Sequence, residues 1–147
     1  MKILNQFKMQ LTARSSNESF ARCAVASFIS QLDPTLEEIS DIKTAVSEAV
    51  TNCIVHGYRH SDGMIYIKAK ITTDNKVIIK IRDKGCGIAD VKKAMEPLFT
   101  TAPEEERAGL GFAVMKSFCD KVKVKSELEK GTVVTLEKTI AKKEEKG

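Results

Sequence analysis

One helical pattern in the chain carries a carboxylate, an amide and an imidazole at intervals of four residues: Glu48, Asn52 and His56. Residues spaced by four share one side of an α-helix, and the other side of this pattern is apolar. A carboxylate beside a phosphate chain can accept a proton from an attacking hydroxyl, and an amide oxygen suits Mg²⁺. The pattern predicts Glu48 as a general base and Asn52 as a metal ligand. The alternatives are that Glu48 is only a charge on the helix surface and that Asn52 is a buried amide with satisfied partners. His56 is interpreted as a helix-terminal residue.

Two glycine segments follow this helix. The first contains Asp83, Gly85 and Gly87, and the second contains Gly109, Leu110 and Gly111. Glycine lets the backbone approach a ligand closely, and the second segment, placed at the start of a helix, would offer free amides to phosphate. Neither segment is a Walker loop or a dinucleotide fingerprint. Asp83 is therefore either an acceptor for an exocyclic amine in a pocket or a solvated turn residue.

The stretch of residues 97–108 between these segments has polar residues and prolines without a regular period, which predicts a mobile loop. The hydroxyls of Thr100 and Thr101 and the guanidinium of Arg107 could meet phosphate when such a loop closes. The alternative is that all three are ordinary solvated loop residues. Thr132, in a predicted hairpin turn, is either a plain turn residue or a hydroxyl that reaches a base through water.

Composition indicates one domain of ordinary hydrophobicity, with 147 residues of which 42% are hydrophobic and 30% charged. The four cysteines show no C-x-x-C pair, so a zinc site is not expected, and Cys86 has no evident activating base. No long apolar run or signal-peptide pattern is visible, which predicts a cytoplasmic protein without membrane contact. The 24 basic and 20 acidic residues are interspersed, so direct contact with nucleic acid is not expected. Residues 141–147 are expected to form a solvated tail.

The elements that must position these residues can be predicted from periodicity. We expect a strand over residues 4–13, a helix opened by a capping box at Ser15 to Glu18, and a long helix opened by Asp33-Pro34 and ending near Gly57. A hairpin, a short helix over residues 91–95, a third long helix after Gly111 and a last hairpin should follow. This order predicts an α+β sandwich, with a mostly antiparallel sheet and helices on one face.

Taken in this order, the Glu48-x-x-x-Asn52 pair, the two glycine segments and the intervening loop resemble the nucleotide-binding boxes and lid of the GHKL ATPase/kinase superfamily. Within it, the segments of residues 47–52 and 97–101 look like those of the anti-sigma factor serine kinases. Three segments between residues 13 and 35 also fit that group. The resemblance covers nearly the whole chain.

The resemblance implies a Bergerat-type fold, a mobile ATP lid, and ATP or ADP with Mg²⁺ as cofactors. It implies that Asp83 accepts from the adenine amine with help from Thr132, and that the segment from Gly109 to Phe112 surrounds the phosphates. It also implies a homodimer that sequesters a sporulation sigma factor and phosphorylates a serine of an anti-anti-sigma protein, inactivating it. Arg14 and Arg22 fit a role in partner docking by resemblance, and solvated surface is their alternative.

Three competing interpretations stay open at this stage. One is a standalone ATPase of the gyrase branch, which would need a further domain to complete hydrolysis. Another is the catalytic domain of a sensor histidine kinase, which would need a phosphoacceptor helix. The third is a module that binds nucleotide and protein without chemistry, against which the retention of Glu48 argues.

Overall fold

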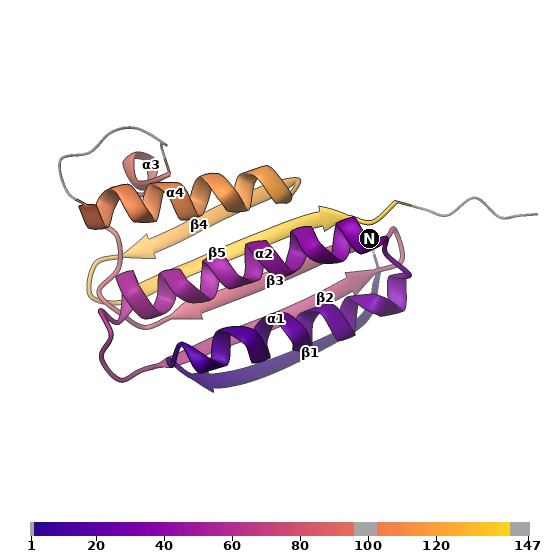
Figure 1. Cartoon of the computed structure of the whole chain (residues 1–147), viewed down its shortest axis with the longest axis horizontal. Helices are drawn as coiled ribbons and strands as arrows, with labels where there is room; N and C mark the ends of the chain where they lie inside the picture. The colour runs from indigo at the N-terminus through magenta and orange to yellow at the C-terminus, as the bar shows by residue number, and fades with distance from the viewer. Residues whose placement is uncertain (1, 96–102, 142–147) are drawn as a thin grey trace, which may run out of the picture.

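The computed structural model describes residues 2–95 and 103–141, with the backbone alone for 103–110. Five strands form one antiparallel sheet in the order β1-β2-β3-β5-β4, and the helices cover one of its faces (Figure 1). The strands are β1 (Ile3–Thr12), β2 (Met64–Thr72), β3 (Lys76–Asp83), β4 (Lys121–Glu127) and β5 (Gly131–Thr139). The helices are α1 (Ser16–Ile29), α2 (Leu36–Asn52), α3 (Val91–Ala94) and α4 (Pro103–Phe118), with a 3-10 turn η1 (Ser30–Leu32) and a π-helical turn η2 (Cys53–Gly57). The predicted α+β class is confirmed.

Alternating apolar residues on the strands produce the core, because side chains of period two point to one face of a sheet. In the pairing of β2 with β3, Ile67 lies opposite Ile81, and both are buried. The helices close this layer with Val25 of α1, Val46 of α2 and Phe112 of α4, each 0% exposed. α2 therefore lies between α1 and α4 across the middle of the sheet, and it is the element that holds Glu48 and Asn52 (Figure 1).

The start of α2 differs from the prediction. Asp33 has a left-handed backbone with φ of 54° and ends η1, so it does not cap α2. Thr35 is the N-cap: its hydroxyl accepts from the Glu38 amide at 3.1 Å, and the Glu38 carboxylate accepts from the Thr35 amide at 2.9 Å. The prediction of Asp33-Pro34 as the opening was wrong, because the Thr-x-x-Glu spacing forms a reciprocal capping box two residues later.

The capping box predicted at the start of α1 does not form either. Ser15 is the N-cap but makes no side-chain capping bond. Glu18, which would have completed the box, instead accepts a hydrogen bond from the Thr51 hydroxyl of α2 at 3.0 Å. A tertiary contact has therefore replaced the local one.

The third long helix begins earlier than expected. The predicted loop of residues 97–108 lies partly outside the described residues, and from Pro103 onward the backbone is helical. Proline at the first helical position, followed in sequence by glutamates, is a pattern that favours a helix start. The segment Gly109-Leu110-Gly111 consequently lies inside α4 and not at its N-terminus.

Near the C-terminus, the amide of Ala141 donates to the Glu38 carboxylate at 2.9 Å, and the rest of the expected tail lies outside the described residues. Among the described helices, none combines the length and apolarity that crossing a membrane requires.

Candidate functional site

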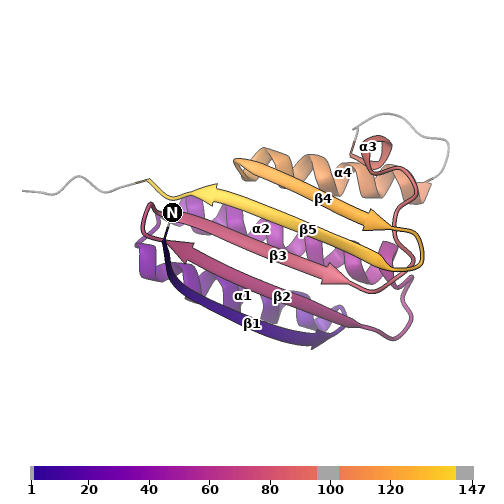
Figure 2. The same cartoon turned by 180° about the vertical axis from the view of Figure 1, so that it is seen from behind.

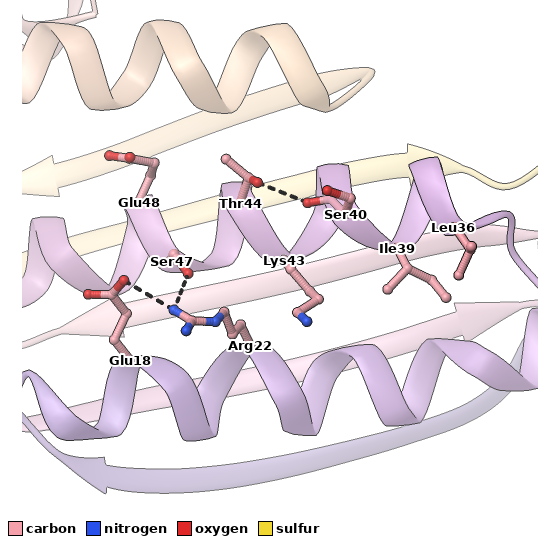
Figure 3. Close-up of a pocket in the computed structure, with 9 residues that line it drawn as sticks. All are labelled: Glu18, Arg22, Leu36, Ile39, Ser40, Lys43, Thr44, Ser47 and Glu48. Atoms are coloured by element: carbon pink, nitrogen blue, oxygen red, sulfur yellow. Dashed lines mark hydrogen bonds and ion pairs between the residues drawn. The ribbon is translucent and has the colours of Figure 1, made fainter.

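Glu48 and Asn52 lie one turn apart in the second half of α2, as predicted. Asn52 is the last residue of the helix and is 6% exposed, whereas Glu48 is half-buried and points toward α4 (Figure 3). A Cβ atom added to Gly111 of α4 would lie 3.3 Å from Glu48 Oε2. The fold therefore brings the second glycine segment against the predicted base.

The surroundings of Glu48 favour its protonated form more than water does. Burial raises the pKa of this carboxyl group, and the negative charge of Glu18 on α1 raises it further. A general base of higher pKa has a stronger affinity for the proton that it must accept. This electrostatic setting is consistent with the role predicted for Glu48.

Asp83 ends β3 beneath the π-helical turn and is 2% exposed. Its Oδ1 atom accepts a hydrogen bond from the Gly85 amide at 2.9 Å. No donor in the described part of the chain makes a hydrogen bond of ordinary geometry to its Oδ2 atom, which is buried. A Cβ atom at position 57 would lie 2.7 Å from Oδ2, so Gly57 leaves room against the carboxylate. A buried acceptor without a donor is costly, which points to a ligand N–H as the missing partner.

Burial also controls the ionisation of Asp83. It raises the pKa of the carboxyl group, while the Gly85 amide, the Cys53 thiol and the Thr132 amide oppose that rise. The thiol of Cys53 is 1% exposed, and burial together with the charge of Asp83 raises its pKa well above the ordinary value. Cys53 was not predicted at the site, because nothing in its local sequence pattern distinguishes it from a core residue.

The loop after Asp83 is held against the end of α2. The Cys86 amide donates to the Gly57 carbonyl at 2.9 Å, and the Cys86 thiol donates to the His56 carbonyl at 3.1 Å. A Cβ atom on Gly85 would lie 2.1 Å from the Gly57 carbonyl oxygen, and Gly87 has a φ of +74°, so both positions require glycine. Cys86 and His56 thus join two parts of the backbone.

Thr132 is 3% exposed and pairs with Asp83 in the ladder between β3 and β5. Its hydroxyl shares a hydrogen bond of 2.7 Å with the Ser126 hydroxyl of β4. Tyr58 supports the same region, because its hydroxyl accepts from the Lys84 amide at 2.7 Å and donates to the Met64 carbonyl at 2.5 Å. Ser126 and Tyr58 could not be predicted at the site from local patterns, since both act through partners distant in the chain.

An open groove of about 540 Å³ lies along α1 and α2 (Figure 3). Its lining residues are Glu18, Arg22, Leu36, Ile39, Ser40, Lys43, Thr44, Ser47 and Glu48. Arg22 Nη1 lies 3.5 Å from the Glu18 carboxylate and 3.3 Å from the Ser47 hydroxyl. The structure thus brings Arg22 into the same groove as Glu48, whereas Arg14 lies exposed before α1, outside the lining.

The structure describes the remaining predicted site residues only in part. Thr100 and Thr101 lie outside the described residues. Arg107, Gly109 and Leu110 belong to the backbone of α4, with their side chains outside the description. Phe112 is fully buried, so its side chain serves packing.

The family comparison identifies the fold and its relatives. The profile described as "Histidine kinase-like ATPase domain" matches residues 11–138. An "Anti-sigma F factor" of Heyndrickxia coagulans is 54% identical over 140 residues, which cover 95% of this chain and 95% of that protein. The "Anti-sigma F factor" of Caldanaerobacter subterraneus subsp. tengcongensis is 56% identical over 142 residues, covering 97% of this chain and 99% of the relative.

A solved structure, that of the RsbU and RsbW domains of Rv1364c from Mycobacterium tuberculosis, has the same fold. It superposes with a TM-score of 0.69 at 20% identity and covers 95% of this chain, which spans 33% of that longer chain. The likeness at this identity concerns the fold alone. With the family profile and the full-length relatives, the chain belongs to the histidine kinase-like ATPase family, in the group of the anti-sigma F factors.

Proposed function

We propose that this protein is an anti-sigma factor and an ATP-dependent protein serine kinase. It would bind and inhibit a sporulation sigma factor of the sigma F type and phosphorylate a serine of an anti-anti-sigma protein, inactivating it. Full-length relatives with the name "Anti-sigma F factor" support the first activity. The observation that carries the second is the position of Glu48, which lies against Gly111 and also lines the open groove. A cytoplasmic location remains our prediction.

The buried residues fit a nucleotide. Asp83 Oδ2 lacks a donor among the described residues, and the exocyclic amine of adenine would supply one. Thr132, next to Asp83 in the ladder, would assist through its hydroxyl. Gly85 and Gly87 would let the backbone lie close to the base. Thr100, Thr101, Arg107 and the segment from Gly109 to Phe112 remain candidates for phosphate contacts.

The donor set near Asn52 fits Mg²⁺ only together with a nucleotide. No group of three or more His, Cys, Asp or Glu side chains that could hold a metal occurs in the described ranges. Asn52 would supply one amide oxygen, and phosphate and water oxygens would complete the shell, as Mg²⁺ prefers. When bound, the ion would neutralise charge on the transferred phosphoryl group. Glu48 would accept the proton of the acceptor serine.

The groove is the surface that we propose for partners. Arg22 is about one third exposed there, which leaves its guanidinium accessible to a carboxylate of a sigma factor or an anti-anti-sigma protein. Arg14, exposed just before α1, would extend the docking surface.

Homodimer formation is also part of the proposal. β1 is an edge strand of the sheet, and apolar side chains are exposed nearby: Ile3 at 40%, Leu4 at 57% and Phe20 at 56%. An edge strand with exposed apolar residues can pair with a second copy.

The test of the kinase proposal is transfer of labelled phosphate from ATP to a candidate anti-anti-sigma protein. Glu48→Gln should retain ATP affinity and lower the rate of transfer at least about 100-fold, because the general base is lost. Asn52→Ala should weaken Mg-ATP binding measured by calorimetry. The matched control is Glu37→Gln, on the exposed first turn of α2, which should leave both properties unchanged.

Undiminished transfer by Glu48→Gln would show that Glu48 is not the base. The label should survive acid, since serine phosphate is acid-stable whereas histidine phosphate is not. An acid-labile label would favour the histidine kinase alternative, and ATP binding without any transfer would favour the pure binding module.

A further inference from the structure

The sheet face opposite the helices is uncovered by any described helix (Figure 2) and is strongly basic. Its outward positions alternate with the buried residues of each strand. The cations at these positions, which we call the open basic face, are Lys8, Lys68, Lys70, Lys76, Lys80, Arg82, Lys121, Lys123 and Lys125. The whole chain has a formal charge of only +4, so the fold has gathered its positive charge on one side.

The strand register aligns four of these lysines in one row across the sheet. Lys8 pairs with Lys68, and Lys68 pairs with Lys80. Thr135 lies next to Lys80, and Lys123 lies next to Thr135. Neighbouring strands are about 4.8 Å apart, so the ammonium groups of Lys8, Lys68 and Lys80 crowd one another, while Lys123 extends the row beyond Thr135. The charges of Lys70 and, to a lesser degree, Lys8 and Lys80 accordingly lower the pKa of Lys68.

Few carboxylates offset this charge. Glu137 and Glu127 are the acidic residues at outward positions of the described strands. Glu137 lies 3.5 Å from Lys76, and Glu127 lies 3.2 Å from Lys130 in the adjoining turn. The row from Lys8 to Lys123 contains no carboxylate, so it remains available to an external polyanion.

We propose that the open basic face binds duplex nucleic acid through its phosphate backbone. Duplex DNA carries about one negative charge per 1.7 Å of its axis, a density that matches crowded lysines. The surface of an ordinary folded protein mixes both signs of charge, and would bring its own cations against the row. Lysine is suited to phosphate as a point charge and does not read base sequence by itself.

Two further features of the face favour a duplex over other polyanions. Single strands are held by stacking of bases on aromatic rings, but the aromatic residue at an outward position, Tyr66, already has Arg82 at 5.6 Å and Lys84 at 4.8 Å from its ring centre. Proteins that bind anionic membranes usually insert apolar side chains as well. The large apolar residues that are exposed in the described chain lie outside the lysine row.

The proposal can be tested by fluorescence anisotropy with a labelled mixed-sequence duplex DNA of about 20 base pairs. We expect weak binding at low salt, with log K falling against log salt at a slope of about −4, as for four to five neutralised phosphates. The variant Lys68→Gln, Lys80→Gln, Lys123→Gln should bind more than about tenfold more weakly and reduce the slope by about three.

The matched control is Lys92→Gln, Lys93→Gln, Lys116→Gln, which removes the same charge from exposed helical positions. Equal weakening in both variants would show that net charge alone is responsible and would overturn the proposal. If the triple variant aggregates, Lys80→Gln and Lys123→Gln alone should each reduce the slope by about one.

Other probes decide the class of partner. Absence of duplex binding at 50 mM salt would mean that the lysines only keep an uncovered sheet from associating. The other probes are poly-glutamate, vesicles with anionic lipid and single-stranded DNA. The proposal would also be overturned if one of them bound as tightly as the duplex and lost affinity to the same extent in the triple lysine variant. Because no residue of the nucleotide site is changed, these results are independent of the kinase proposal.

The charge pattern of the sequence led us to expect no contact with nucleic acid. We revise that expectation, because the strand pairing gathers on one sheet face lysines that are distant in the sequence.

Discussion

At Asp83, the proposed function and the stability of the fold make opposite demands. Its carboxylate is 2% exposed, and its Oδ2 atom has no hydrogen-bond donor in the described structure. Such a group costs free energy until a ligand satisfies it, a conflict that is common at binding sites. The pKa of Asp83 is raised, chiefly by burial, so the folded protein binds this proton more tightly than the unfolded chain does.

We predict that Asp83→Asn stabilises the nucleotide-free protein and abolishes nucleotide binding. A raised folded-state pKa means that the penalty of ionising Asp83 grows as pH rises through the interval from the unfolded to the folded pKa, and is complete above the folded value. Removing this penalty by Asp83→Asn should raise the free energy of unfolding by on the order of 1 kcal/mol at pH 7. The gain should be much smaller at a pH below the unfolded pKa. Urea unfolding at both pH values measures this. Equal effects at both would show that ionisation is not the cause.

Among the helices and strands, α2 connects the two halves of the site. Its C-terminal end passes into the π-helical turn Cys53–Gly57, which brings the Gly57 backbone against Asp83 and the loop after it. Such turns occur often at functional sites because they redirect the chain without ending the helix abruptly. The position of Asn52 relative to Asp83 therefore depends on this turn.

The opposite end of α2 can be tested through its capping box. Thr35→Ala should lower the free energy of unfolding by about 1 kcal/mol, because the Glu38 amide loses its acceptor. Ser15→Ala is the matched control: Ser15 occupies the same position on α1 without a capping bond, and its loss should change stability by less than about 0.5 kcal/mol. Urea denaturation distinguishes the two. Equal losses would mean that the bond at Thr35 contributes nothing specific.

The same box should give stability a dependence on pH. Burial acts to raise the pKa of Glu38, but bonds from the Thr35 and Ala141 amides outweigh it and leave the pKa lowered. A lowered folded-state pKa stabilises the protein fully above the unfolded value, and this contribution is lost as pH falls through the folded value. The difference in free energy of unfolding between wild type and Glu38→Gln, measured by urea denaturation, should accordingly shrink in acid.

For the molecule as a whole, the distribution of charge and apolar surface decides how copies can meet. The open basic face disfavours contact with a second copy at the lysine row, because like charges would oppose one another. The edge strand β1 and the apolar residues near it remain available. We therefore place the proposed dimer contact at that edge.

We predict that light scattering of the purified protein gives a mass of twice 16.2 kDa. Leu4→Lys should shift the equilibrium toward monomer. Leu128→Lys is the control, because Leu128 is similarly exposed, 59% against 57%, but lies in the turn between β4 and β5. A monomeric wild type would refute the dimer, and a dimer insensitive to Leu4→Lys would place its interface elsewhere.

The sequence by itself determined most of the local structure and the pairing of Glu48 with Asn52. Strand and helix periodicities are properties of neighbouring residues, so β2, β3 and the body of α2 could be predicted. Four-residue spacing likewise fixes one face of a helix without knowledge of the fold. The order of the glycine segments added the resemblance to a family.

Only the tertiary structure decided the features that depend on residues distant in the chain. Glu18 contacts Thr51 in place of capping its own helix, and Asp83 lies against Gly57 and Cys53. The row from Lys8 to Lys123 exists only because pairing of the strands aligns lysines from four strands across one face. Sheet register and helix packing are non-local, and the sequence pattern of one segment does not contain them.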